Sequence, residues 1–271
     1  MMIAAPAPLG VGAVLRAHWP EYLIEAWALG MFMISAGVFS TLLGVPGSPL
    51  QRIVPSEDLR RALVGVAMGL TAIALIYSPW GKRSGAHMNP AVTLTFLHLG
   101  KIARWDAAFY IVAQFIGGLL GVLLTRAMLG SRFADPAVNY VATVPGAAGV
   151  AAAFAGEVLI SCGLMVVILF AINTPKFARC TGLFAGTLVA LFITFEAPYS
   201  GMSINPARTV ASALPSGVWT AAWIYFVAPV GGMLLAVEIR RALVRGAQVA
   251  CAKLNHHGSR RCIFCGFGCG N

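Results

Sequence analysis

Two stretches of this chain repeat one frame, Ser-Gly-x-x-x-Asn-Pro-Ala, at 84–91 and again at 200–207. In each, Asn can cap a helix and Pro occupies the first helical position, the order in which a helix starts most readily. The apolar residues that follow, 91–99 and 207–214, number about ten or fewer, half of what a membrane crossing needs. Each stretch therefore predicts a loop that leads into a short helix.

The rest of the chain is too apolar for a soluble domain. Its 271 residues are 59% hydrophobic and only 10% charged, with a mean hydropathy of +0.81, whereas soluble domains carry about 25% charged residues. Pro20 and Glu21 are expected to begin the first membrane helix. Six segments are long and apolar enough to cross a bilayer, namely 21–43, 58–79, 105–128, 150–172, 179–197 and 218–239.

The two short helices fall between spans two and three and between spans five and six. A helix too short to cross can lie at membrane depth only where protein or water satisfies its open backbone. Asn205 follows Asn89 by 116 positions and Gly182 follows Gly65 by 117, so one half repeats the other. Three spans per half invert the second copy. The predicted fold is an all-α membrane protein with six transmembrane helices and two re-entrant half-helices in an inverted three-plus-three repeat.

The repeated frame resembles the signature of the aquaporins, the major intrinsic protein family of membrane channels. The resemblance extends to Arg208 after the second Asn-Pro-Ala, to Glu25 and Glu157 in the first helix of each half, and to the helix order between about Tyr22 and Arg241. It implies a passive channel for water and small uncharged solutes, with an aquaporin-like fold and a pore in each subunit of a homotetramer. The expected organisation is a cytoplasmic tail at 1–19, a channel domain at 20–243 with repeats 20–129 and 150–243, and a Cys/Gly-rich cytoplasmic tail at 244–271.

The repeated triplets are the expected centre of the pore. If the side-chain oxygens of Asn89 and Asn205 cap the half-helices, their amide NH₂ groups point into the lumen as donors. Both helix N-termini also bring positive dipole ends there, which disfavours cations. A water molecule held by both amides has its hydrogens turned toward the exits, so a proton-conducting chain is interrupted. The predicted pore residues are Asn89, Pro90, Ala91, Asn205, Pro206 and Ala207.

Charged residues inside the spans need a partner or a function. The resemblance implies that Glu25 and Glu157 brace the re-entrant loops by accepting backbone N–H groups. It also implies that Arg208 is the filter arginine. The segments before each Asn are expected to be extended, with carbonyl groups turned toward the lumen. Glu196, near the outer mouth, either pairs with Arg208 or is solvated.

The other filter positions implied by the resemblance are Met68, Ile193 and Met202. Water-selective relatives place His and an aromatic residue at two of these sites, whereas this chain has three apolar side chains facing one Arg. An apolar wall accepts the carbon face of a small polyol while Arg208 holds its oxygen, which predicts conduction of glycerol-sized solutes as well as water. Residues outside the filter favour water alone by resemblance, namely Thr209, Ala213 and Tyr225-Phe226.

The distribution of basic residues predicts the orientation. Of the 19 Lys and Arg residues, thirteen fall in segments on the side of the termini and five in the opposite loops. Arg208 belongs to neither group, because it is a candidate pore residue. The positive-inside rule then places both termini in the cytoplasm, with the protein in a bacterial-type inner or plasma membrane. The net charge of +10 is scattered between apolar spans, which favours membrane lipid over nucleic acid as a partner.

Four cysteines crowd the end of the chain. Cys262-x-x-Cys265-x-x-x-Cys269, with His256 and His257 upstream, has donors that can converge tetrahedrally on zinc. Without a second clean pair, no metal site and no cofactor are predicted, and an unstructured Gly/Cys tail is the alternative.

The sequence offers two alternatives to a channel, a secondary transporter and an enzyme. A secondary transporter also builds a midplane site from broken helices, with Glu25 and Glu157 as the only candidate coupling acids. Saturable, uncoupler-sensitive uptake distinguishes a transporter from a channel. An enzyme is not predicted, because the sequence has no recognisable motif that combines a nucleophile, a general base and a residue that orients the base.

Overall fold

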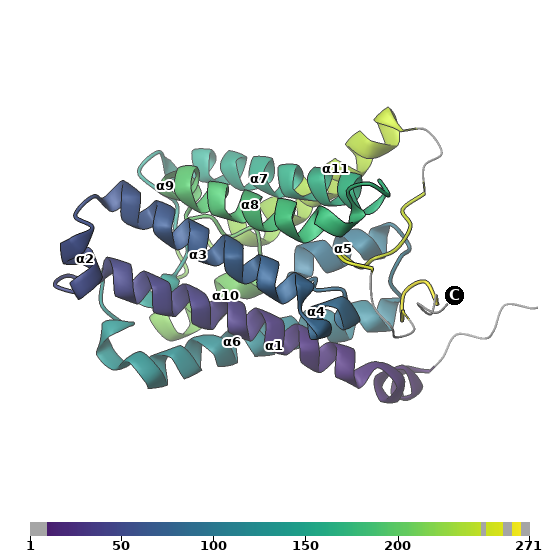
Figure 1. Cartoon of the computed structure of the whole chain (residues 1–271), viewed down its shortest axis with the longest axis horizontal. Coiled ribbons are helices and arrows are strands. Elements are labelled where there is room, and N and C mark those ends of the chain that lie inside the picture. The colour runs from purple at the N-terminus through teal and green to yellow at the C-terminus, as the bar shows by residue number, and fades with distance from the viewer. Residues whose placement is uncertain (1–9, 245–247, 257–261, 267–271) are drawn as a thin grey trace, which may run out of the picture.

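The computed structural model describes residues 10–244, 248–256 and 262–266, and these residues form helices, turns and loops without a strand (Figure 1). Residues 1–9 of the expected N-terminal tail lie outside the described residues. The long helices are α1 (Val11–Gly44), α3 (Glu57–Tyr77), α6 (Arg104–Leu129), α7 (Gly149–Ile172), α8 (Thr181–Phe195) and α11 (Ile224–Leu243). The short elements are α2 (Pro49–Ile53), α4 (Pro79–Ser84), α5 (Pro90–His98), α9 (Ala197–Ser200), α10 (Pro206–Ser216), and the 3₁₀ turns η1 (Gly130–Arg132), η2 (Asn139–Val141) and η3 (Ala178–Cys180).

Five helices are long and apolar enough to cross a membrane, namely α1, α3, α6 with η1, α7, and η3 with α8. The sixth, α11, has 20 residues, and Glu238, Arg240 and Arg241 lie in its last turns. It begins six residues after the predicted start of the span at 218. Gly217, in the left-handed region with a φ of 70°, ends α10, and residues 220–223 form a turn before α11 begins. Apolar composition alone did not distinguish this turn from a helix.

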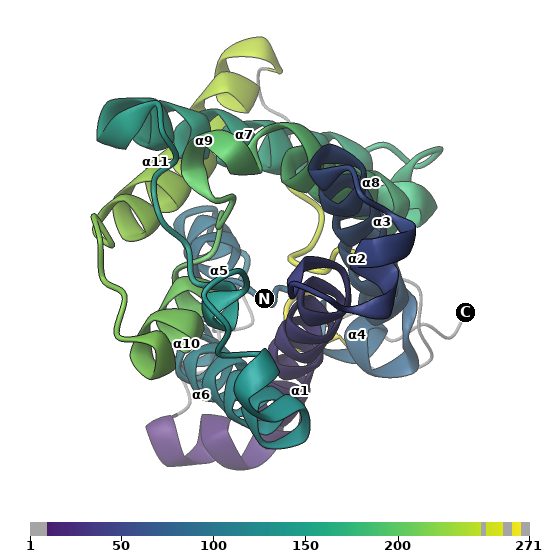
Figure 2. The same ribbon diagram turned by 90° about the vertical axis from the view of Figure 1, so that its left-hand side faces the viewer.

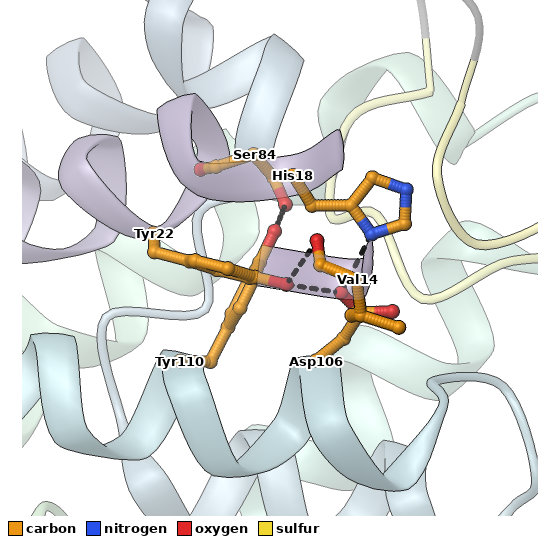
Figure 3. Close-up of polar contacts among 6 residues, drawn as sticks. All are labelled: Val14, His18, Tyr22, Ser84, Asp106 and Tyr110. Atoms are coloured by element: carbon orange, nitrogen blue, oxygen red, sulfur yellow. Dashed lines mark hydrogen bonds and ion pairs between the residues drawn. The ribbon is translucent and has the colours of Figure 1, made fainter. Parts of the chain in front are cut away.

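The first helix begins at Val11, not at Pro20 as predicted. Pro20 lies inside α1, where it removes one backbone hydrogen bond and kinks the helix. The first turns of α1 accordingly lie across the long axis of the bundle (Figure 2). Asp106 of α6 holds α1 on both sides of Pro20, because its Oδ1 lies 2.7 Å from His18 Nδ1 and accepts from Tyr22 Oη at 2.6 Å (Figure 3).

The long helices pack in three pairs, α1 on α6, α3 on α8, and α7 on α11. Small residues let the backbones approach closely. A Cβ atom built on Gly117 of α6 would lie 2.0 Å from the carbonyl oxygen of Ala26 in α1, and one on Gly69 of α3 would lie 2.5 Å from that of Gly186 in α8. A larger side chain at either position requires the helices to separate.

The two half-helices connect the halves of the molecule. The first, α5, packs on α11 of the second half, and α10 packs on α6 of the first half. They lie toward opposite ends of the long axis (Figure 1). We call the end that carries α4, α5 and the described tail segments the tail end, and the end that carries α2 the far end. Each half-helix thus packs on a long helix of the other half, as expected for the inverted repeat.

Candidate functional site

Each half-helix is capped by the Asn of its triplet. Asn89 Oδ1 accepts from the backbone N–H of Ala91 at 2.8 Å. Asn205 Oδ1 accepts from Ala207 N at 3.0 Å and from Arg208 N at 3.2 Å. These bonds satisfy backbone donors that the first turn of a helix leaves open, and they fix the direction of both amides.

The amide groups also cross between the two loops, which the sequence did not predict. Asn89 Nδ2 donates to the carbonyl oxygen of Ile204 at 2.6 Å, and Asn205 Nδ2 donates to that of Met88 at 2.7 Å. An amide NH₂ has two N–H donors, so one donor of each Asn ties the loops together and the second is available to the lumen. Both Asn side chains line the central cavity.

The central cavity has a volume of about 310 Å³. It extends from the connection between α6 and α7, around Val138 and Val141, past both Asn side chains, to Leu254 of the tail. The four side chains predicted as a filter all line it, which are Met68, Ile193, Met202 and Arg208. The structure thus brings the predicted filter residues and the repeated triplets to one cavity.

The loops before the triplets are more constrained than the expected extended segments. Ala86 and Met88 have φ angles of 54° and 50°, and Met202 and Ile204 both have 50°. The left-handed region costs a residue with a side chain about 1–3 kcal/mol unless its surroundings hold it. The same strained positions recur 116 residues apart, so the repeat extends to the backbone conformation.

Two buried carboxylates hold these loops. Glu25 Oε1 accepts from His87 N at 3.1 Å and Oε2 from Met88 N at 2.7 Å. Glu157 Oε1 accepts from Ser203 N at 2.6 Å and Oε2 from Ile204 N at 2.7 Å. Both glutamates are fully buried. Each carboxylate therefore binds consecutive backbone N–H groups of a strained loop, which offsets the cost of its conformation.

Further partners of the loops were not found from the sequence. Ser84 and Ser200 each donate a hydroxyl to the nearby glutamate, at 2.8 and 3.0 Å. Tyr110 of α6 donates to the carbonyl oxygen of Ser84 at 2.7 Å (Figure 3), and Tyr225 of α11 donates to that of Ser200 at 2.6 Å. The shared role of the two tyrosines could have been inferred from the sequence, because they lie 115 positions apart and are therefore in register with the repeat.

The guanidinium of Arg208 is oriented by a residue that sequence reasoning missed. Its Nη1 donates to the hydroxyl of Thr143, which lies in the connection between α6 and α7. Arg208 makes no ion pair with Glu196 in the described part of the chain. The carboxylate of Glu196 packs instead against Gly156 of α7, where an added Cβ would lie 2.4 Å from Oε1.

The described parts of the C-terminal segment, 248–256 and 262–266, are not the unstructured tail that was the alternative to a metal site. In the described range 248–256, Ala252, Lys253 and Leu254 are buried. Ala250 N donates to Asn173 Oδ1 at 2.8 Å. The Gly- and Cys-rich sequence has no helical or strand periodicity, and for that reason it suggested disorder. The described residues are instead ordered by packing on the helices.

Comparisons with known proteins agree with this architecture. A family model described as Major intrinsic protein matches residues 15–239. The chain is 35% identical over 209 residues to Aquaporin NIP2-3 of Zea mays, covering 76% of this chain and 67% of that protein. It is 36% identical over 170 residues to Aquaporin NIP1-4 of Oryza sativa subsp. japonica, covering 62% of this chain and 60% of that protein. The X-ray structure of the aquaglyceroporin from Plasmodium falciparum superposes with a TM-score of 0.68 at 19% identity, over 82% of this chain and 95% of that one.

Proposed function

Because the chain belongs to the major intrinsic protein family, we propose that its central cavity is the pore of a passive channel for water and small uncharged solutes. It is an integral membrane channel and not an enzyme. The observation that carries the proposal is the pair of capped half-helices, tied by the bonds from Asn89 to Ile204 and from Asn205 to Met88 at the wall of the cavity. This pair places two amide donors and two helix N-termini beside the permeating molecule.

Ions are excluded at two levels of the pore in this proposal. The N-terminal dipole ends of α5 and α10 oppose a cation beside the Asn pair. Arg208 adds a full positive charge at the wall, held in place by Thr143. The free amide donors orient passing water by its oxygen, which interrupts proton transfer along a water chain.

The lining of the filter favours small neutral solutes in addition to water. Met68, Ile193 and Met202 offer apolar contacts, and Arg208 offers hydrogen-bond donors on the same cavity. A molecule such as glycerol or urea can place its carbon face on the apolar side chains and its oxygen toward Arg208. A larger or charged solute loses hydration that this wall cannot replace.

The bracing of the loops supports a channel over a coupled transporter. Glu25 and Glu157, the coupling acids that a transporter was expected to use, are occupied by backbone N–H and hydroxyl donors. Stopped-flow light scattering on proteoliposomes tests this choice. We expect water and glycerol fluxes that rise linearly with the imposed gradient and are insensitive to uncoupler. Saturation together with uncoupler sensitivity would favour a transporter.

We also propose that both termini are cytoplasmic, in a bacterial-type inner or plasma membrane, and that the channel assembles as a homotetramer. The orientation is supported by the excess of basic residues in the segments at the tail end, such as Lys82, Lys101 and Arg179. A membrane-impermeant thiol reagent applied to intact cells should spare Cys269, which is not one of the four clustered residues, and strong labelling of Cys269 from outside would overturn the orientation. Crosslinking of the purified protein should yield species up to four chains.

A further inference from the structure

Three cysteines and one histidine converge at the tail end of the bundle. Cys251 and Cys262 Sγ lie 3.5 Å apart, and His256 Nε2 lies 3.0 Å from Cys265 Sγ. All four ligand atoms lie within 4.8 Å of one another. The three cysteines are free thiols. Two separate segments, 248–256 and 262–266, thus direct four metal-binding atoms to one point.

The spacing of these atoms fits a tetrahedral zinc ion. Zn–S bonds of about 2.3 Å and Zn–N bonds of about 2.0–2.1 Å give edges of about 3.8 Å between sulfurs and about 3.5 Å between sulfur and nitrogen. The longest separation in the cluster, at most 4.8 Å, therefore has to close by at most about 1.3 Å. Three Cys and one His form a common structural zinc set, and thiolates disfavour the hard cations Mg²⁺ and Ca²⁺.

The local backbone also suits a metal. Residues Cys262 to Cys265 have the two-residue spacing of zinc-binding pairs, and their turn is closed by a bond from Gly266 N to Cys262 O at 3.0 Å. Three thiolates around Zn²⁺ leave a net charge of −1. Lys253, buried in the same tail, brings a compensating positive charge.

An access route reaches the cluster from outside the pore. A second cavity of about 280 Å³ is lined by Cys251, His256 and Cys265, together with Ile172 and Lys253. It is distinct from the central cavity, although Leu254 borders both. A metal ion can therefore bind or leave without passing through the pore.

The same tail contacts the first re-entrant loop. Leu254 N donates to Gly85 O at 3.2 Å, and His87 Nε2 donates to Ala252 O at 2.8 Å. The ring of Phe264 stacks on that of His87, with centroids 5.6 Å apart and an angle of 6° between the planes. The tail therefore donates a hydrogen bond to a backbone carbonyl of the loop. It also places an apolar side chain in the lumen, because Leu254 lines the central cavity.

From these contacts we propose that Cys251, His256, Cys262 and Cys265 bind one zinc ion, which holds the tail across the first re-entrant loop and closes the pore at its tail end. Leu254 lies between the first two ligands and Phe264 between the last two, so fixing the ligands fixes the two side chains that meet the loop. The closure rests on the proposed channel function, whereas zinc binding does not.

Metal analysis of the purified full-length protein tests the site. After incubation with zinc chloride and removal of the excess, we expect one zinc per chain. The double variant Cys262→Ser/Cys265→Ser should lose it, whereas two controls should keep it: Cys180→Ser, in η3 outside the cluster, and Cys269→Ser, which lies outside the described residues. Absence of stoichiometric zinc, or a Cys251–Cys262 disulfide in its place under reducing conditions, would overturn the site.

Water permeability of the same preparations tests the closure. Couplings between two sites shift an equilibrium by about 5- to 150-fold, and we expect a rise in permeability of at least the lower value when chelator removes zinc. The double Cys variant should be open in both conditions, and Leu254→Ala should retain zinc but leak. Equal permeability with and without bound zinc would overturn the closure. Absence of flux in the chelated protein and in every variant would refute the proposed channel instead, while the zinc content still reports on the site.

Discussion

Replacing Glu157 with Gln should destabilise the second re-entrant loop while leaving the shape of the side chain intact. The carboxylate accepts from Ser203 N at 2.6 Å, Ile204 N at 2.7 Å and Ser200 Oγ at 3.0 Å. Glutamine keeps one acceptor oxygen and turns an NH₂ group toward the other backbone N–H. Two donors then face each other in a site that is fully buried.

The size of the effect follows from these bonds. A hydrogen bond to a charged group contributes about 1.5–3 kcal/mol, and a buried donor left open costs about 1–3 kcal/mol. The left-handed φ angles of Met202 and Ile204 each add about 1–3 kcal/mol of strain that the carboxylate no longer offsets. We expect a loss of about 3 kcal/mol in unfolding free energy, which for a chain of this size lowers Tm by about 6–12 °C.

The assay is thermal unfolding in detergent, paired with water permeability in proteoliposomes. The Ile204 carbonyl also accepts from Asn89, so a displaced loop should lower permeability as well as Tm. Glu238→Gln is the matched control, since Glu238 is exposed on α11 and pairs with Arg241, and it should change Tm little. A Glu157→Gln protein with the Tm and permeability of the unmodified chain would refute the bracing role of this carboxylate.

Three other variants test separate parts of the structure. Asn205→Asp replaces a pore donor with a negative charge and should raise cation or proton leak in a pH-dye assay, whereas unchanged leak in the folded variant would show that the amide is not the barrier. Ile193→His with Met68→Phe should exclude glycerol while keeping water flux, and glycerol flux that persists would contradict the assignment of the filter. Gly117→Leu places a side chain where even a Cβ would lie 2.0 Å from Ala26 O, so unfolding free energy should fall by about 1–3 kcal/mol, and thermal unfolding unaffected by this change would contradict the close crossing of α1 and α6.

The sequence was most informative where structure is determined locally. Asn89 and Asn205 begin their half-helices because capping depends on a side chain and the backbone two or three residues away. The inverted arrangement could also be inferred, because three spans per half permit no other placement of the second copy. The start of α1 was misjudged because Pro20 suits both the first turn of a helix and a kink within a longer one.

Contacts between distant segments could not be read from the sequence. Thr143 meets Arg208 across 65 positions, and Asn89 meets Ile204 across 115. Neither pair has a local pattern, because the two partners come together only after the helices have packed. The tail was misjudged for the same reason, since Leu254 and Cys251 are ordered by their contacts with other segments.

The most direct measurement records water permeability and proton leak in the same proteoliposomes, with a scattering signal and an internal pH dye. The account predicts rapid shrinkage in an osmotic gradient, while an imposed membrane potential leaves the proton leak at the level of protein-free vesicles. Slow shrinkage with purified, folded protein freed of zinc, or a proton leak that rises in proportion to water flux, would contradict a pore built on the paired Asn half-helices.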